Sequence, residues 1–348
     1  MQQNMAATIE EKTSSPPLAC APSSCEFAIP VIDISGYLLS NPATVPSIVK
    51  AIRLAAISPG FFQITGHSVS TDLRDRLFAA LKIFFAVPQS TKTSVHRNNS
   101  SCMRGYEAVG DQMLEKGIFD RKEGFMIGQE LVGSGNDGLG GLRFGQGPNQ
   151  WPTESTCPGF RTVMEEYFEE MRLLSRTVFR LVALSLGLEE KFFDNFVYNR
   201  DSITMCRAHR YPPITTSVSE TTDIKPRGIG AHTDFGAMTL LLQDGVGGLE
   251  VFHRPTATWH PVTPILDAYV VNIGDMMERW TNDKYTSTLH RALSPVSKQD
   301  RYSVAFFNEG LLDQVVECIS TCLEPGEKPK YEPVTVEDHL RMRYGSSY

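Results

Sequence analysis

Three residues in the last third of the sequence have types and spacing that suit a metal ion. His232 and Asp234 stand two positions apart at the end of a predicted strand, so both side chains can point to one face. His290 lies late on another predicted strand, over residues 285–291, and supplies a second imidazole at the rim of a barrel. Two neutral imidazoles and one carboxylate on one face of octahedral Fe(II) leave three coordination positions open, although zinc accepts the same three residues. The sequence therefore predicts a metal centre with room for dioxygen and a cosubstrate.

A candidate anchor for an anion follows shortly after His290. Arg301 and Ser303 also stand two positions apart on a predicted strand, so a guanidinium and a hydroxyl share one face. Together they can hold a carboxylate through charge-assisted hydrogen bonds, each of which contributes about 1.5 to 3 kcal/mol. A carboxylate anchor beside an open metal site is what a 2-oxo acid cosubstrate needs. This pair therefore favours iron over zinc.

The elements that must position these residues fall into two blocks. The first block predicts two short strands and three helices, over residues 29–33, 60–65, 45–57, 72–85 and 160–186. Residues 87–160 are predicted to be irregular, and we expect them to border a pocket. The second block predicts eight short strands at roughly ten-residue spacing, which is typical of a jelly roll or barrel. These strands cover residues 202–211, 229–233, 238–242, 248–252, 258–262, 268–273, 285–291 and 301–307.

The composition is that of a folded protein with a sizeable core, since 41% of the 348 residues are hydrophobic and 21% are charged. Because the helices precede the strands, we expect one α+β domain that is mainly β. Residues 1–26, rich in Ser, Thr, Pro and Ala, predict a flexible arm, and a single oxygenase domain is expected over 27–348. Its parts are an N-terminal α/β buttress with pocket loops, a jelly-roll catalytic core and a C-terminal helical tail, over residues 27–200, 201–310 and 311–348.

The charge pattern bears on the partners. The formal net charge is −7 and no run of Lys or Arg gathers anywhere, so the sequence carries no electrostatic signature for nucleic acid or an anionic membrane. No apolar stretch has the length of a membrane span, and no secretory signal is evident. The seven cysteines lack C-x-x-C pairs and are predicted to be reduced thiols. We therefore expect a cytoplasmic protein that binds a small molecule.

These motifs resemble those of the Fe(II)/2-oxoglutarate-dependent oxygenases of the isopenicillin N synthase-like family. The family pattern H-x-D…H…R-x-S is similar to His232-Thr-Asp234, His290 and Arg301-Tyr-Ser303. Further motifs follow the order of the family over nearly the whole chain: Ile29-Pro-Val-Ile-Asp33, Gly60-Phe-Phe62, Arg104-Gly-Tyr106, Lys122-Glu-Gly-Phe125, Tyr211-Pro-Pro213 and Val271-Asn-Ile-Gly-Asp275. The resemblance implies a double-stranded β-helix core with Fe(II) at its open end, and 2-oxoglutarate and O2 as cosubstrates. It also implies that Tyr211 contacts the far carboxylate of 2-oxoglutarate.

The activity that this resemblance implies is the oxidation of a small organic molecule, in specialised metabolism or in nucleobase or amino-acid modification, with release of succinate and CO2. Hydroxylation is the default outcome, and desaturation or ring closure needs only a differently placed radical. Two alternatives stay open. One is an iron oxidase of the same fold that does not consume 2-oxoglutarate, since such members can retain R-x-S. The other is a jelly-roll binding protein without catalysis.

Two residues on the strand that ends at Tyr211 are candidates for contact with the substrate or cosubstrate. Arg207 and His209 share the face of Tyr211 by the period of two. Arg207 is expected either to meet a carboxylate or carbonyl of the main substrate or to form a structural ion pair. His209 stands where plant members often have Asn, and it either touches 2-oxoglutarate or is a core histidine.

Three aromatic residues complete the candidates. Phe307 lies six positions after Arg301 on the same predicted face, at a family position that often stacks on flat substrates. Its alternative role is ordinary core packing. Tyr106 and Phe125 lie in the segment expected to border the pocket, and they are predicted to contact the substrate.

Overall fold

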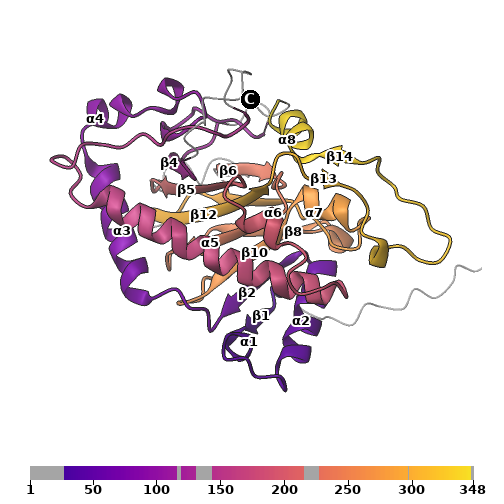
Figure 1. The fold of residues 1–348 in the computed structure, drawn as a ribbon. Coiled ribbons are helices and arrows are strands. Elements are labelled where there is room, and N and C mark those ends of the chain that lie inside the picture. Colours follow the sequence, from indigo (N-terminus) through magenta and orange to yellow (C-terminus); the bar gives the residue numbers. More distant parts are fainter. Residues whose placement is uncertain (1–26, 116–118, 131–142, 215–226, 297, 346–348) are drawn as a thin grey trace, which may run out of the picture.

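The computed structural model describes residues 27–115, 119–130, 143–214, 227–296 and 298–345, so the predicted arm lies outside the described residues. Two β-sheets face each other, and helices cover the outer side of the larger sheet (Figure 1). The sheets meet through a small apolar cluster that includes Phe61 and Val270 from the larger sheet and Leu249 and Val251 from the smaller one. This arrangement is the predicted double-stranded β-helix.

The larger sheet has eight strands in the order β1-β2-β10-β7-β12-β5-β4-β3. The β1 and β2 strands run parallel, whereas every other neighbouring pair in this sheet is antiparallel. Along each strand, alternate side chains therefore face the smaller sheet or the helices. The bounds are β1 Val31–Asp33, β2 Phe61–Thr65, β3 Gly105–Glu107, β4 Glu123–Gly128, β5 Ile203–Tyr211, β7 Met238–Gln243, β10 Tyr269–Ile273 and β12 Arg301–Gly310.

The smaller sheet has four strands in the order β6-β11-β8-β9, all antiparallel. They are β6 (Arg227–His232), β11 (His290–Leu293), β8 (Leu249–His253) and β9 (Thr258–Pro261). Because β6 and β11 are neighbours, the two predicted metal-binding histidines come from adjacent strands.

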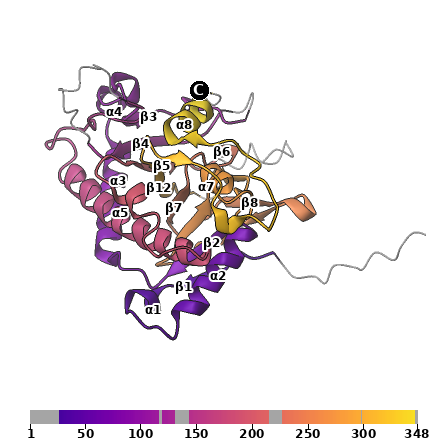
Figure 2. The ribbon, with the colours of Figure 1, turned by 45° about the vertical axis from the view of Figure 1, so that its right-hand side comes forward.

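The helical layer packs on the outer face of the larger sheet, where α5 (Phe160–Ser185) runs across it with α3 (Thr71–Ala86) alongside (Figures 1 and 2). The predicted apolar stripe of α5 is buried in the main core. The α3 helix begins after Ser70, whose side chain accepts a hydrogen bond from the Leu73 backbone N–H at 3.2 Å, as an N-cap residue does. The other helices are α1 Ser35–Leu38, α2 Val45–Ile57, α4 Gln89–Ser94, α6 Asp194–Tyr198, α7 Asp275–Trp280 and α8 Val336–Gly345.

Three local predictions were wrong or incomplete. The stretch predicted as irregular contains β3 and β4, which extend the larger sheet beyond β5. The strand predicted over 285–291 begins only at His290. The residues before it do not pair with a neighbouring strand, because the hydroxyls of Thr286 and Thr288 donate hydrogen bonds to backbone carbonyl groups at the end of α2 and just after it. Within the described part of the C-terminal tail, α8 is the one α-helix, and a β13–β14 pair (Val315–Val316 and Val334–Thr335) precedes it.

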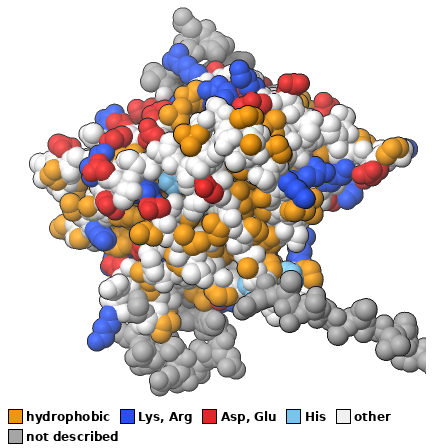
Figure 3. Space-filling view, turned by 90° about the horizontal axis from the view of Figure 1, so that it is seen from below, with side chains coloured by type: hydrophobic (Ala, Val, Ile, Leu, Met, Phe, Trp, Pro, Cys, Tyr) orange, Lys and Arg blue, Asp and Glu red, His pale blue; other side chains and the backbone are white. Residues whose placement is uncertain are grey.

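The surface bears on the expected partners. No helix among the described residues is long and apolar enough to cross a membrane. The face in Figure 3 shows hydrophobic, acidic and basic side chains interspersed. The cysteines of the described residues are all free thiols, as predicted: Cys102, Cys157, Cys206, Cys318 and Cys322.

Candidate active site

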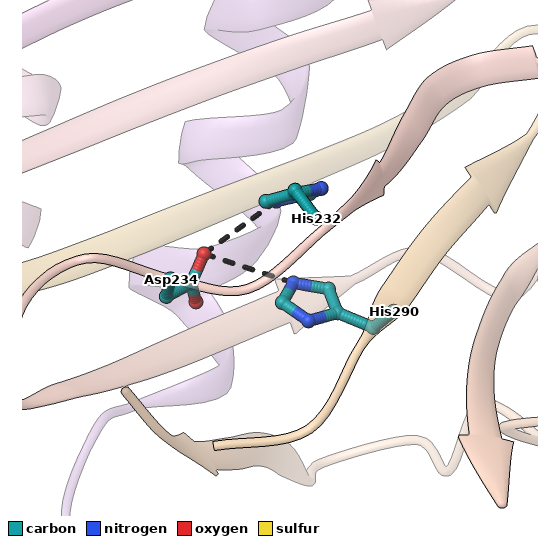
Figure 4. A group of neighbouring side chains, drawn as sticks. All are labelled: His232, Asp234 and His290. Atoms are coloured by element: carbon teal, nitrogen blue, oxygen red, sulfur yellow. Dashed lines mark ion pairs between the residues drawn. The ribbon is translucent and has the colours of Figure 1, made fainter. Parts of the chain in front are cut away.

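The three predicted metal ligands converge between the two sheets. His232 ends β6, and His290, the first residue of β11, lies directly opposite it in the antiparallel register. The loop after β6 brings Asp234 beside both imidazoles (Figure 4). Asp234 Oδ1 lies 3.5 Å from His232 Nε2 and 3.7 Å from His290 Nε2. The three side chains therefore direct two imidazole nitrogens and one carboxylate oxygen to a common point. These three atoms lie within 4.8 Å of one another.

Backbone hydrogen bonds fix both imidazole rings in the orientation that a metal needs. His232 Nδ1 lies 2.8 Å from the Gly230 carbonyl oxygen, and His290 Nδ1 lies 3.0 Å from that of Thr288. A carbonyl oxygen only accepts hydrogen bonds, so each Nδ1 carries a proton and, in the neutral ring, each Nε2 is the nitrogen that can bind a metal. Such contacts orient metal-binding histidines in known sites.

The carboxylate of Asp234 is oriented in the same way. Its Oδ2 accepts hydrogen bonds from Thr239 Oγ1 at 2.6 Å and Asn272 Nδ2 at 2.7 Å, which leaves Oδ1 facing the imidazoles. Burial opposes ionisation, but the nearby His290 and His232 and the Thr239 hydroxyl hold the pKa of Asp234 well below its usual range. Burial and the neighbouring His232 lower the pKa of His290 to about 4. A carboxylate beside a neutral imidazole suits a divalent cation.

The predicted carboxylate anchor lies on the same face of the larger sheet. Arg301 is 1% exposed, and its Nη2 donates to Gln243 Oε1 at 2.9 Å. Its Nη1 lies 3.5 Å from Ser303 Oγ, which in turn lies 3.4 Å from the Tyr211 hydroxyl. The Nε group of Arg301 has no hydrogen-bond partner within the described ranges, and no carboxylate there pairs with this guanidinium. A buried guanidinium without a counter-ion is unfavourable, so this group fits an anionic ligand.

Two cavities meet at two of the three candidate metal ligands, His232 and Asp234. The first, which we term the anchor cavity, is lined by Arg301, Ser303 and Tyr211 together with all three ligands. The second, which we term the outer cavity, is lined by Met126, Met205, Arg207, Phe235, Glu309 and Tyr344, among others. Both cavities share the walls at His209, Ile229, His232, Asp234 and Phe307. The site can therefore hold a small anion and a second molecule on two sides of one metal position.

Three of the substrate candidates lie on these walls. Phe307 and His209 line both cavities, and Arg207 lines the outer one. Arg207 Nη2 also forms an ion pair with Glu107 and a hydrogen bond of 3.2 Å to Gln112 Oε1, so the alternative of a structural ion pair is present. His209 is 4% exposed, and its Nε2 has no hydrogen-bond partner among the described residues. Burial and the nearby Lys122 lower the pKa of His209 well below its usual range, so the ring is neutral.

Neither Tyr106 nor Phe125, which are predicted to contact the substrate, lines the two cavities at the metal site. Both belong to the core between the larger sheet and the helices. The Phe125 ring packs against Phe84 at 4.7 Å between centroids, and the Tyr106 hydroxyl donates to Glu123 Oε2 at 2.7 Å. On β4, it is the next residue, Met126, that reaches the outer cavity.

Sequence reasoning also missed the C-terminal contribution to the site. Tyr344 of α8 lines the outer cavity, and its ring lies 5.1 Å from that of Phe235, in the loop that carries Asp234. His339 Nε2 lies 2.8 Å from the Phe235 carbonyl oxygen, and Arg343 forms an ion pair with Asp275. No local signal links α8 to that loop, since 104 positions separate His339 from Phe235. These contacts tie the wall of the cavity to the metal site.

The core position of Phe125 can be tested by its effect on stability. Phe125→Ala should lower the free energy of unfolding by about 3 to 5 kcal/mol, because it leaves a cavity in a packed aromatic cluster. Urea unfolding followed by circular dichroism measures this change. The same substitution at Phe119, which is 64% exposed, should change it by no more than about 0.5 kcal/mol. Unaltered stability of Phe125→Ala combined with weaker substrate binding would restore the original interpretation.

Comparison with known proteins agrees with this geometry. Residues 201–310 match the 2OG-Fe(II) oxygenase superfamily, and residues 29–154 match the family described as non-haem dioxygenase in morphine synthesis N-terminal. The chain is 41% identical over 323 residues to the 2-oxoglutarate-Fe(II) type oxidoreductase hxnY of Emericella nidulans, and the match covers 92% of this chain and 90% of that protein. The chain therefore belongs to the 2OG-Fe(II) oxygenase superfamily, and it is a 2-oxoglutarate- and Fe(II)-dependent dioxygenase.

Other relatives point the same way. The chain is 36% identical to the 2-oxoglutarate-dependent dioxygenase caaD of Aspergillus niger, over 93% of this chain and 94% of that protein. Among solved structures, a full-length Neurospora crassa protein in complex with alpha-KG and thymine has a TM-score of 0.80 and 29% identity. That match covers 92% of this chain and 97% of the Neurospora chain. The two alternatives without 2-oxoglutarate chemistry are therefore not supported.

Proposed function

We propose that this protein oxidises a C–H bond of a small organic molecule in specialised metabolism, by hydroxylation or by desaturation or ring closure. In this proposal His232, Asp234 and His290 hold Fe(II), and Arg301 is the principal anchor of 2-oxoglutarate. The observation that carries the proposal is the anchor cavity, in which three oriented ligand atoms and a buried guanidinium without a carboxylate partner among the described residues line one space.

Each residue has a definite task in this reaction. Once bound, Fe(II) would supply the oxidising chemistry with O2 and 2-oxoglutarate as cosubstrates, and succinate and CO2 would be the products of 2-oxoglutarate. The Arg301 guanidinium pairs with a carboxylate of 2-oxoglutarate, and the hydroxyls of Ser303 and Tyr211 donate hydrogen bonds to it. Asn272 and Thr239 hold the Asp234 carboxylate in one orientation, so the ligand set needs little rearrangement when metal binds.

The outer cavity supports the small-molecule part of the proposal. Its walls combine apolar and aromatic side chains with several polar and charged groups, which can orient a small organic ligand. These walls place the molecule beside His232 and Asp234 while excluding water. The Neurospora crassa structure holds thymine, a small ring compound, together with alpha-KG. By analogy, the substrate is a molecule of similar size, and we propose that residues 27–348 act on it as a single domain.

Substrate-stimulated turnover tests this function. The protein is incubated with Fe(II), 2-oxoglutarate, O2 and a library of small ring compounds, and succinate and product masses are measured. We expect one or more compounds to raise succinate formation and to gain one oxygen atom, or lose two hydrogens, for each succinate formed. If only proteins or nucleic acids raised succinate formation, the small-molecule proposal would be wrong.

A further inference from the structure

Glu309 is a buried acidic residue on the wall of the outer cavity. It has no role in the iron chemistry proposed above. The pairing of β12 with β5 shifts register between Asn308 and Gly310, so Glu309 is the extra residue of a β-bulge. Asn308 Nδ2 bonds Ser175 Oγ of α5, and Gly310 lies against Phe196 of α6, so both neighbours face the helices. Glu309 faces the cavity. Bulges that aim a side chain in this way are common beside active sites.

One oxygen of this carboxyl group has no partner among the described residues. Glu309 is 1% exposed, and its Oε1 accepts a hydrogen bond from the Tyr344 hydroxyl at 3.3 Å. Its Oε2 makes no hydrogen bond within the described part of the chain. A Cβ atom at Gly236 would lie 2.8 Å from Glu309 Oε2, which is too close. The lack of a side chain at Gly236 therefore leaves space for this oxygen. Buried carboxyl oxygens are nearly always hydrogen-bonded, so an unpartnered one on a cavity wall points to a ligand.

The charge of Glu309 depends on what occupies the site. Burial and the nearby Asp234 carboxylate raise the pKa of Glu309 to about 8. A cation bound by Asp234 offsets the charge of that carboxylate, and a ligand that donates a hydrogen bond stabilises the ionised form of Glu309. A filled site therefore favours Glu309 as a hydrogen-bond acceptor.

The walls around Glu309 suit a flat ring. Phe307 precedes it by two positions on the same face of β12, and Phe235 lies on the loop after β6. Met126 and Met205 line the larger-sheet side of the cavity. Thioether side chains adapt to flat surfaces and make favourable contacts with aromatic rings. The cavity thus combines apolar faces with an unpartnered acceptor.

We propose that Glu309 is a specificity-determining residue that accepts a hydrogen bond from an N–H or O–H group on the ring of the main substrate. The inference rests on the proposed function in one respect, namely that the outer cavity holds this substrate. A lactam N–H and a phenolic O–H are the two chemical sources of such a donor. Methylation of either group removes the donor, so Glu309 selects against the methylated ring.

Matched pairs of ring compounds test the inference without turnover. The full chain is loaded with Fe(II) and 2-oxoglutarate under anaerobic conditions, and dissociation constants are measured by ligand-observed NMR. The pairs are 2-pyridone with N-methyl-2-pyridone, and 4-methylphenol with 4-methylanisole. We expect at least one donor compound to bind at least about tenfold more tightly than its methylated partner. The pair that shows the larger ratio identifies the lactam or the phenol as the source of the donor.

Variants assign this selectivity to Glu309. Glu309→Met, which keeps the side-chain length but has no acceptor, should reduce the ratio to about one, whereas the matched control Glu169→Met at an exposed position of α5 should retain it. Equal binding of the partners by the wild-type protein, no binding of either donor, or an unchanged ratio in Glu309→Met would each overturn the inference. The wild-type ratio remains informative if the variant does not fold. Both variants should bind 2-oxoglutarate equally well. If they do so but the ring selectivity differs from the expected result, the inference about Glu309 is wrong while the oxygenase function is unaffected.

Discussion

His232→Ala should abolish the Fe(II)-dependent conversion of 2-oxoglutarate to succinate. The substitution removes one of three converging donor atoms and leaves Asp234 Oδ1 and His290 Nε2, which lie 3.7 Å apart, as the only ligands of the set. Loss of a residue that merely orients a ligand weakens metal binding by about 10- to 100-fold, so loss of a ligand should weaken Fe(II) binding by more than about 100-fold. Metal content after dialysis and succinate formation measure the two effects.

The control for this variant is His260→Ala. His260 lies on β9, two strands from the strand of His290, and its Nε2 contacts the Thr258 hydroxyl at 2.7 Å. This variant should bind one equivalent of Fe(II) and form succinate at the wild-type rate. If His232→Ala kept both properties, His232 would not be an iron ligand.

Arg301→Ala should raise the dissociation constant of 2-oxoglutarate by at least about 100-fold. The guanidinium can give two charge-assisted hydrogen bonds to a carboxylate, each contributing about 1.5 to 3 kcal/mol, and a loss of about 1.4 kcal/mol corresponds to a factor of ten. Calorimetry in the presence of Mn(II) measures binding without turnover. Fe(II) binding should stay within about twofold of the wild type, because Arg301 contacts Gln243 and Ser303 and none of the metal ligands.

Two further variants sharpen this result. Arg301→Lys should recover only part of the affinity, since an ammonium group cannot make the planar bidentate contact of a guanidinium. Arg341→Ala removes an arginine on α8 whose side chain is 57% exposed, and it should leave 2-oxoglutarate binding unchanged. Wild-type affinity in Arg301→Ala would assign the cosubstrate anchor to another residue.

The centre of the site could be predicted from sequence because it follows a local rule. Two pairs of residues, His232 with Asp234 and Arg301 with Ser303, stand two positions apart. The period of a strand puts Arg301 and Ser303 on one face of β12, whereas Asp234 reaches His232 from the loop just after β6. The structure brings the first pair together with His290 and sets the second pair on the wall of the same cavity. The same rule would have found Glu309 if the predicted strand had extended to residue 310.

The walls of the site depend on contacts between distant segments, which local patterns do not reveal. The β4 strand pairs with β5, where Phe125 lies opposite Ala208, and this pairing decides that Phe125 faces the helices and Met126 the cavity. Neither β3 nor β4 has a strong local strand signal, since β3 has only three residues and β4 contains two glycines. The contact of Tyr344 with the loop after β6 has the same nonlocal origin.

The most direct test of the central claim is an anaerobic titration of the protein with Fe(II) and 2-oxoglutarate, followed by visible absorption. We expect the wild-type protein to develop the charge-transfer band of an Fe(II)–2-oxoglutarate chelate, saturating at one equivalent of each. We expect no band for His232→Ala, and a band for Arg301→Ala only at much higher 2-oxoglutarate concentrations. Absence of the band in the wild-type protein, or an undiminished band in His232→Ala, would show that these residues do not form the iron and 2-oxoglutarate site.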